Sequence, residues 1–170
     1  MLVGVISDTH DVLPGIDRAV EVFRREGVEH VIHLGDYVAP FSLLRLLDQL
    51  DGVRFNGVFG NNDGEKPGLL RIAERHGSWI SDQGLEVEVG GRRVLLLHGF
   101  GSPDNTRRIV YALASSRKWD AVLYGHTHQP DVRYIRGVLV LNPGTASGIL
   151  NSASVAILDT RRMTARVIRI

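Results

Sequence analysis

Cysteine is absent from all 170 residues of the sequence. Disulfides, iron–sulfur clusters and thiolate zinc sites are therefore excluded. Any bound metal ion must be held by nitrogen and oxygen ligands, which suit manganese, iron, cobalt, nickel, zinc or magnesium.

The sequence also lacks a charge excess and long apolar runs. Twenty Lys and Arg residues stand against 19 Asp and Glu residues, so the formal net charge is only +1. This balance is not that of a protein that binds polymeric nucleic acid or an anionic membrane. The sequence contains no run of about 18 apolar residues, the length needed to span a membrane. Its first residues also lack the basic start of a signal peptide. We therefore expect a cytoplasmic protein with one domain, residues 1–170.

The apolar segments change in character halfway along the chain. In the first half, short apolar runs typical of buried strands alternate with segments of helical spacing. In the second half, paired runs around tight turns, such as Gly90-Gly91, are typical of hairpins. We expect strands at residues 2–6, 31–34, 53–59, 85–89, 92–97, 121–124, 132–135, 138–141, 153–158 and 165–170, and helices at residues 14–26, 41–50, 67–76 and 106–115. The predicted fold class is α/β, with two mixed β-sheets packed as a sandwich and flanked by helices.

Side chains that can bind a metal follow five of the predicted strands. The segments are Asp8-Thr9-His10, Gly35-Asp36, Gly60-Asn61-Asn62-Asp63, His98-Gly99 and Gly125-His126-Thr127-His128. Each segment alone is also explained as a turn, a cap or a surface loop. Together they place four of the seven histidines, with aspartates and asparagine, at strand ends, where sites form in α/β folds. This set could hold two metal ions that share one carboxylate.

Two of these segments carry metal-binding residues two positions apart. On an extended backbone, the side chains of Asp8 and His10 would point the same way, as would those of His126 and His128. The intervening Thr9 and Thr127 would then point away from the metal ions.

The ordered set of five segments resembles the calcineurin-like metallophosphoesterase superfamily. The short chain and the segment Asn142-Pro143-Gly144-Thr145 resemble its small bacterial and archaeal phosphodiesterase branch. The resemblance covers about residues 1–146. It implies that a first metal ion is held by Asp8, His10, Asp36 and His128, and a second by Asp36, Asn61, His98 and His126. Asp36 can bridge because a carboxylate has two oxygens, whereas an imidazole nitrogen binds one ion.

The resemblance implies a phosphodiesterase that uses two divalent metal ions and acts on a small phosphoester. Manganese is the expected metal, with nickel, cobalt, iron, zinc and magnesium as alternatives. The two ions would lower the pKa of a bridging water, and the resulting hydroxide would attack phosphorus in line. Asp36 and Asn62 are the predicted catalytic residues. Phe100 either lines the substrate pocket or packs in the interior.

Asn62 departs from the wider superfamily. Many members have a histidine at this position, near the leaving group, and asparagine cannot donate a proton as an acid. A missing acid slows steps that need proton transfer by about 10²–10⁴-fold. We therefore expect diesters with acidic leaving groups to be better substrates than alkyl monoesters.

Three other interpretations use the same fold. A non-catalytic scaffold similar to a retromer subunit would have lost metal-binding histidines, yet all four are present here. A nuclease would carry long extra segments and a basic surface, which this chain lacks. A protein phosphatase would be longer and would retain the histidine that Asn62 replaces. The exposed hairpins could also pair two copies of the chain as a homo-oligomer.

Overall fold

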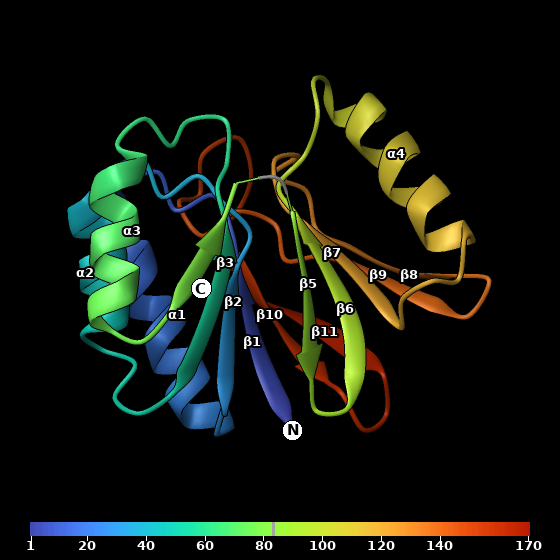
Figure 1. Cartoon of the computed structure of the whole chain (residues 1–170), viewed down its shortest axis with the longest axis horizontal. Helices are drawn as coiled ribbons and strands as arrows, with labels where there is room; N and C mark the ends of the chain where they lie inside the picture. The colour runs from blue at the N-terminus through green and yellow to red at the C-terminus, as the bar shows by residue number, and fades with distance from the viewer. Residues whose placement is uncertain (83) are drawn as a thin grey trace.

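The computed structural model describes residues 1–82 and 84–170. Two β-sheets pack face to face, and helices cover their outer faces (Figure 1). This arrangement confirms the predicted fold class.

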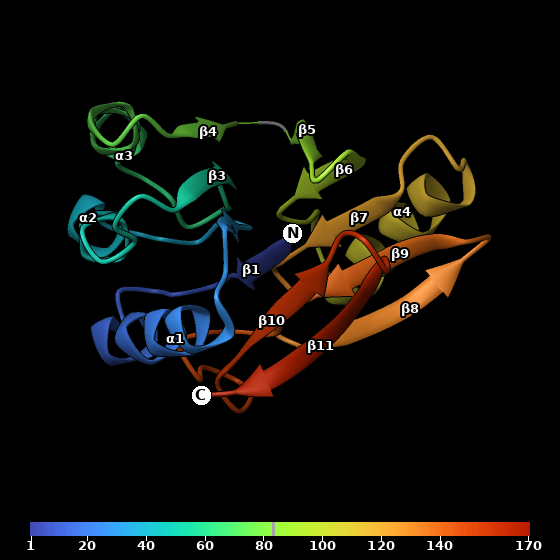
Figure 2. The ribbon, with the colours of Figure 1, turned by 90° about the horizontal axis from the view of Figure 1, so that it is seen from below.

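The first sheet has six strands in the order β11-β10-β1-β2-β3-β4. Its strands are β1 (Leu2–Ile6), β2 (His30–His33), β3 (Arg54–Val58), β4 (Trp79–Ser81), β10 (Ser154–Asp159) and β11 (Thr164–Arg169). Strands β1 to β4 run parallel, whereas β10 pairs antiparallel with both β1 and β11. The C-terminal hairpin therefore completes the sheet that the N-terminal half begins (Figure 2).

The second sheet has five strands in the order β5-β6-β7-β9-β8. Its strands are β5 (Leu85–Val89), β6 (Arg92–Leu97), β7 (Ala121–Tyr124), β8 (Asp131–Ile135) and β9 (Val138–Asn142). Strands β6, β7 and β9 are parallel, and β5 and β8 are antiparallel edge strands. The three predicted hairpins, β5–β6, β8–β9 and β10–β11, are confirmed.

Helices α1 (Leu13–Glu26), α2 (Pro40–Leu47) and α3 (Lys66–Arg75) cover the first sheet, and α4 (Pro103–Ser115) covers the second (Figure 2). Each has a proline in its first two positions, where the missing N–H leaves no hydrogen bond unmade. Helix α4 begins three residues before the predicted Thr106, because the Ser102 hydroxyl caps it by accepting a hydrogen bond from Asn105 N at 3.2 Å.

The apolar core forms layers between these elements. Side chains such as Val5, Ile32 and Leu96 fill the space between the two sheets. A second cluster, which includes Phe23 and Leu43, lies between the first sheet and its three helices. The two packed sheets therefore hold their strand ends in fixed relative positions.

Strand β4 was not expected from the sequence. It spans only three residues, and Trp79 at its start is 54% exposed, so no alternating pattern marks it. Within the described ranges, no helix is long and apolar enough to cross a bilayer.

Candidate metal centre

The five predicted segments meet at one edge of the sandwich. Those that follow β1, β2 and β3 come from the six-stranded sheet, and those that follow β6 and β7 come from the five-stranded sheet. Backbone hydrogen bonds join their loops: Asp8 N donates to Gly35 O at 3.0 Å, and Gly125 N donates to His98 O at 2.9 Å. The site therefore lies between the two sheets and depends on their packing.

The first group of candidate ligands consists of Asp8, His10 and His128. Their ligand atoms lie within 4.8 Å of one another. Asp8 Oδ2 accepts hydrogen bonds from Ser7 Oγ at 2.6 Å and from His126 N at 3.1 Å. Asp8 Oδ1, in contrast, is buried without a hydrogen-bond partner among the described residues and lies 3.2 Å from His128 Nε2. A buried carboxylate oxygen without a donor is destabilising unless a cation binds it, so this group fits a metal ion.

The second group lies around the side-chain oxygen of Asn61. Asn61 Oδ1 is 3.0 Å from His98 Nε2 and 2.9 Å from His126 Nδ1. Asp36 lies between the two groups, because its Oδ2 is 3.5 Å from both His98 Nε2 and His10 Nε2. This is the position that a bridging carboxylate requires.

Backbone carbonyl groups fix the orientation of three imidazole rings. The paired atoms are His98 Nδ1 and Leu34 O at 2.7 Å, His126 Nε2 and Gly101 O at 2.6 Å, and His128 Nδ1 and Ile149 O at 2.9 Å. Because a carbonyl oxygen only accepts, the facing nitrogen must carry the proton. The other nitrogen of each neutral ring then presents a lone pair to the centre, as in histidines that bind metal ions.

The charges around the imidazoles favour a cation. The Asp8 carboxylate, whose Oδ1 lies 3.2 Å from His128 Nε2, raises the pKa of His128. Burial would lower the pKa of His98, but the Asp36 and Asp8 carboxylates outweigh it and raise that pKa. Burial would likewise raise the pKa of Asp36, but the neighbouring His98 and the hydrogen bonds from Asn62 hold it below its ordinary value. The carboxylates therefore stay ionised and attract positive charge, which divalent cations can supply in place of protons.

A family model for the calcineurin-like phosphoesterase superfamily domain matches residues 1–163. The chain belongs to the calcineurin-like phosphoesterase superfamily. It is therefore a phosphoesterase, a hydrolase of phosphoric esters. The predicted family is confirmed, and its divalent-metal requirement agrees with the ligand groups above.

Three known proteins match all or nearly all of the chain. A phosphodiesterase of Methanocaldococcus jannaschii is 35% identical, and the match spans 99% of this chain and 98% of the relative. A solved archaeal phosphodiesterase superimposes with a TM-score of 0.86 at 33% identity, with complete coverage of both chains. Wild-type Vps29 from Entamoeba histolytica, solved with zinc, has a TM-score of 0.71 at 19% identity, with 100% and 98% coverage. The likeness to Vps29 concerns the fold alone.

The backbone of this phosphoesterase corrects one prediction. Asp8, His10, His126 and His128 have φ values of 53°, 43°, 66° and 56°, so their segments are not extended. The chain turns directly after the strands, and this turn, rather than strand alternation, aims each pair into the site. Thr9 and Thr127 do point elsewhere, as predicted: Thr9 Oγ1 is 3.2 Å from His33 Nε2, and Thr127 Oγ1 accepts from Asn142 Nδ2 at 3.1 Å.

Asp63 positions the loop that carries Asp36, a role the sequence did not reveal. Its buried carboxylate accepts hydrogen bonds from three backbone N–H groups: Asp36 N at 3.1 Å, Val38 N at 2.8 Å and Gly60 N at 2.7 Å. Aspartate in a Gly-Asn-Asn-Asp segment is usually a turn residue. The sequence therefore did not indicate that Asp63 would bind the backbone of Asp36, 27 residues away.

Two glycines allow the backbone to approach the centre closely. A Cβ atom on Gly60 would lie 2.1 Å from Asp36 Oδ1. Gly35 has a φ of 97°, and a Cβ there would lie 2.6 Å from His98 Nδ1. Any larger residue at either position would displace a ligand.

Asn62 contacts the predicted bridging carboxylate directly. Its backbone N donates to Asp36 Oδ1 at 2.8 Å, and its Nδ2 donates to Asp36 Oδ2 at 2.7 Å. Both contacts hold Asp36 in place. The assignment of Asn62 and Asp36 as catalytic residues stays a prediction.

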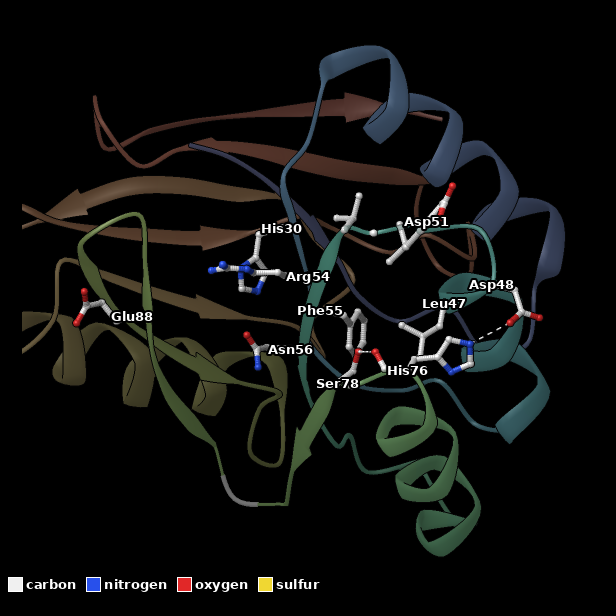
Figure 3. Close-up of a pocket in the computed structure, with 14 residues that line it drawn as sticks. His30, Leu47, Asp48, Asp51, Arg54, Phe55, Asn56, His76, Ser78 and Glu88 are labelled. Atoms are coloured by element: carbon white, nitrogen blue, oxygen red, sulfur yellow. Dashed lines mark hydrogen bonds and ion pairs between the residues drawn. The ribbon is translucent and has the colours of Figure 1, made fainter.

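A pocket of about 770 Å³ opens at the opposite ends of the parallel strands (Figure 3). Its lining includes His30 and Arg54, at the starts of β2 and β3, and His76 after α3. None of the predicted metal ligands lines it. The chemistry of this phosphoesterase is therefore expected at the other ends of the strands, where the ligands converge.

Proposed function

We propose that this chain is a dinuclear-metal phosphodiesterase that hydrolyses small phosphodiesters. The observation that carries the proposal is the buried Asp8 Oδ1, which lies without a partner among the described residues and faces His128 Nε2 at 3.2 Å. Asp36, between the two groups of ligands, supports a second ion beside the first.

Asp8, His10, Asp36 and His128 would hold one ion, and Asp36, Asn61, His98 and His126 the other. When bound, two divalent cations would make hydroxide available from water near neutral pH and offset charge on the phosphoryl group. Asn61 contributes a neutral amide oxygen, which limits negative charge where a phosphate must approach. Manganese is the expected metal, and nickel, cobalt, iron, zinc and magnesium are alternatives because their ligand preferences overlap.

The proposed substrate is a small diester with an acidic leaving group. Asn62 cannot protonate a departing alkoxide, and its amide is occupied with Asp36. The formal charge of +1 does not favour polymeric nucleic acid. The names of the relatives, an archaeal phosphodiesterase among them, agree with a diester substrate.

The test is hydrolysis of bis(4-nitrophenyl) phosphate with added manganese, before and after chelation. We expect chelation to abolish turnover and manganese, nickel or cobalt to restore it. His128→Asn should reduce turnover by about 100-fold or more. The matched control is His76→Asn, because His76 lies outside the centre and pairs with Asp48 at 3.0 Å. Full turnover by chelator-treated, metal-free protein would contradict the proposal.

The same fold also supports a second proposal, a non-catalytic interaction scaffold. Vps29 shares only the fold with this chain, and the complete set of candidate ligands favours hydrolysis. No turnover of any diester with any of these metals, together with tight metal binding, would decide for the scaffold.

A further inference from the structure

Two loops beside the metal centre carry exposed apolar side chains. Phe100, between β6 and α4, is 45% exposed. Ile149 and Leu150, between β9 and β10, are 43% and 84% exposed. Exposed apolar side chains beside a candidate site can form part of a binding surface.

Each loop is joined to a different group of metal ligands. The carbonyl oxygen of Gly101, next to Phe100, accepts a hydrogen bond from His126 Nε2 at 2.6 Å. The carbonyl oxygen of Ile149 accepts one from His128 Nδ1 at 2.9 Å. One apolar loop therefore lies beside each of the two groups, at the same edge of the sandwich (Figure 1).

Local hydrogen bonds fix the backbone of both loops. Phe100 N donates to Thr106 Oγ1 at 2.9 Å, and Asn105 Nδ2 donates to Phe100 O at 3.1 Å. Ile149 N donates to Ser147 Oγ at 3.2 Å, and Leu150 has a φ of 65°. Left-handed backbone is unfavourable for leucine. The apolar side chains are thus presented by a defined backbone, one part of which is strained, and such strain often accompanies a binding role.

We infer that Phe100, Ile149 and Leu150 bind the organic arms of the substrate, and that the substrate is a diester with at least one large apolar arm. This inference rests on the proposed function. A diester has two arms on its phosphorus, and the two loops adjoin the two groups of candidate ligands that would hold the phosphoryl group. The arm excludes water from apolar surface that is otherwise hydrated, which strengthens binding. A monoester has only one arm and gains less from the two loops.

The test compares benzyl 4-nitrophenyl phosphate with methyl 4-nitrophenyl phosphate. Both release 4-nitrophenolate, so their ratio of kcat/KM reports contacts with the second arm. We expect the manganese-loaded wild type to prefer the benzyl diester by about tenfold. The double variant Phe100→Ser with Leu150→Ser should lose most of this preference, through a higher KM for the benzyl diester. The methyl diester keeps a 4-nitrophenyl arm that also meets these loops, so the ratio of the two kcat/KM values, rather than either value alone, is the measure.

Val132→Ser is the matched control, because Val132 is 41% exposed but lies on β8, the edge strand of the second sheet. It should keep the full benzyl preference. An equal benzyl preference in the wild type and the double variant would overturn the inference while leaving the proposed function intact.

Binding provides a readout that does not require hydrolysis. Phenylphosphonate and methylphosphonate have a carbon–phosphorus bond and are not cleaved, so calorimetry can compare their affinities. We expect phenylphosphonate to bind the wild type more tightly and with a more negative heat-capacity change, which reports apolar burial. Both differences should shrink in the double variant. A wild type that hydrolyses neither diester would defeat the proposed function, whereas phosphonates that bind with equal affinity would defeat the inference about the apolar loops.

Discussion

The Nε2 atoms of His10 and His128 lie 3.3 Å apart, although 118 residues separate them in the chain. Asp8 Oδ1, which is buried, lies 3.9 Å from the first of these atoms and 3.2 Å from the second. Two neutral imidazoles with facing ring nitrogens can form at most one hydrogen bond. A cation would satisfy both nitrogens and the carboxylate together.

Metal binding should stabilise the folded protein. A ligand that binds only the folded state adds about 2.7 kcal/mol to the free energy of unfolding at 100 times its Kd. We expect manganese to raise the melting temperature of the wild type, and to raise that of His128→Ala by much less. His76→Ala, which alters an exposed histidine, should respond like the wild type. If manganese raised the melting temperature of all three proteins equally, His128 would not be a metal ligand.

Asp36→Asn should lose about 100-fold or more in turnover and at least one of the two bound ions, while the fold is retained. The physical reason is that an amide has one oxygen and therefore cannot bridge two cations as a carboxylate does. Steady-state kinetics, metal content and circular dichroism measure the three effects. An unchanged rate with two bound ions would refute the bridging role.

Asp63→Asn should destabilise the protein by about 1–3 kcal/mol, because one acceptor oxygen becomes an NH₂ group that faces backbone N–H donors. Asp63 Oδ2 accepts from both Asp36 N and Gly60 N, and Oδ1 accepts from Val38 N. Metal affinity should also fall, since the Asp36 loop loses support. Urea unfolding and metal titration test both effects, with Asp51→Asn at an exposed position as the control. If the two variants are equally stable, the Asp63 hydrogen bonds contribute little.

Asn62→His should improve turnover of diesters with poor leaving groups more than turnover of those with good ones. Histidine can donate the proton that a poor leaving group needs, whereas asparagine cannot. The measurement is the dependence of kcat/KM on the pKa of the leaving group, which should become shallower. A gain confined to good leaving groups would show that position 62 is not next to the departing oxygen.

His33 should make the stability of the protein depend on pH. Burial lowers the pKa of His33 to about 3 from its ordinary value of 6.5, so the unfolded chain binds a proton that the folded chain does not. Its contribution is complete above pH 6.5 and is lost at about 1.4 kcal/mol per pH unit as the pH falls toward 3. The free energy of unfolding of His33→Gln should lack this pH dependence. Urea unfolding of both proteins between pH 7 and about pH 4 measures the difference, and parallel stability curves would contradict it.

The sequence predicted those helices and strands that are long enough to show a periodic spacing of apolar residues. The apolar spacing after Pro14, with Gly27 at the end, predicted α1, and the Gly90-Gly91 turn predicted the β5–β6 hairpin. Strand β4 escaped prediction because three residues cannot show alternation. The start of α4 was set by Ser102, whose capping hydrogen bond depends on backbone geometry.

At the centre, the sequence was enough to name candidate ligands but not to predict how they are arranged. Paired aspartate and histidine at strand ends were enough to indicate metal chemistry and the family. The left-handed backbone at Asp8 and His10 was not expected, because φ depends on where the following loop must go. The carbonyl groups of Leu34, Gly101 and Ile149, which orient three histidines, carry no signal because every residue has one.

The sequence by itself determined which donor atoms this phosphoesterase can offer a metal ion, since those are properties of individual side chains and the absence of cysteine leaves only nitrogen and oxygen. Tertiary structure alone decided that Asp36 lies between two groups of ligands and that Asp8 Oδ1 is left without a donor. The reason is that these relations join strands of two different sheets, and their distances are set by the packing between the sheets. Local sequence does not encode a distance between residues that meet only when the sandwich closes.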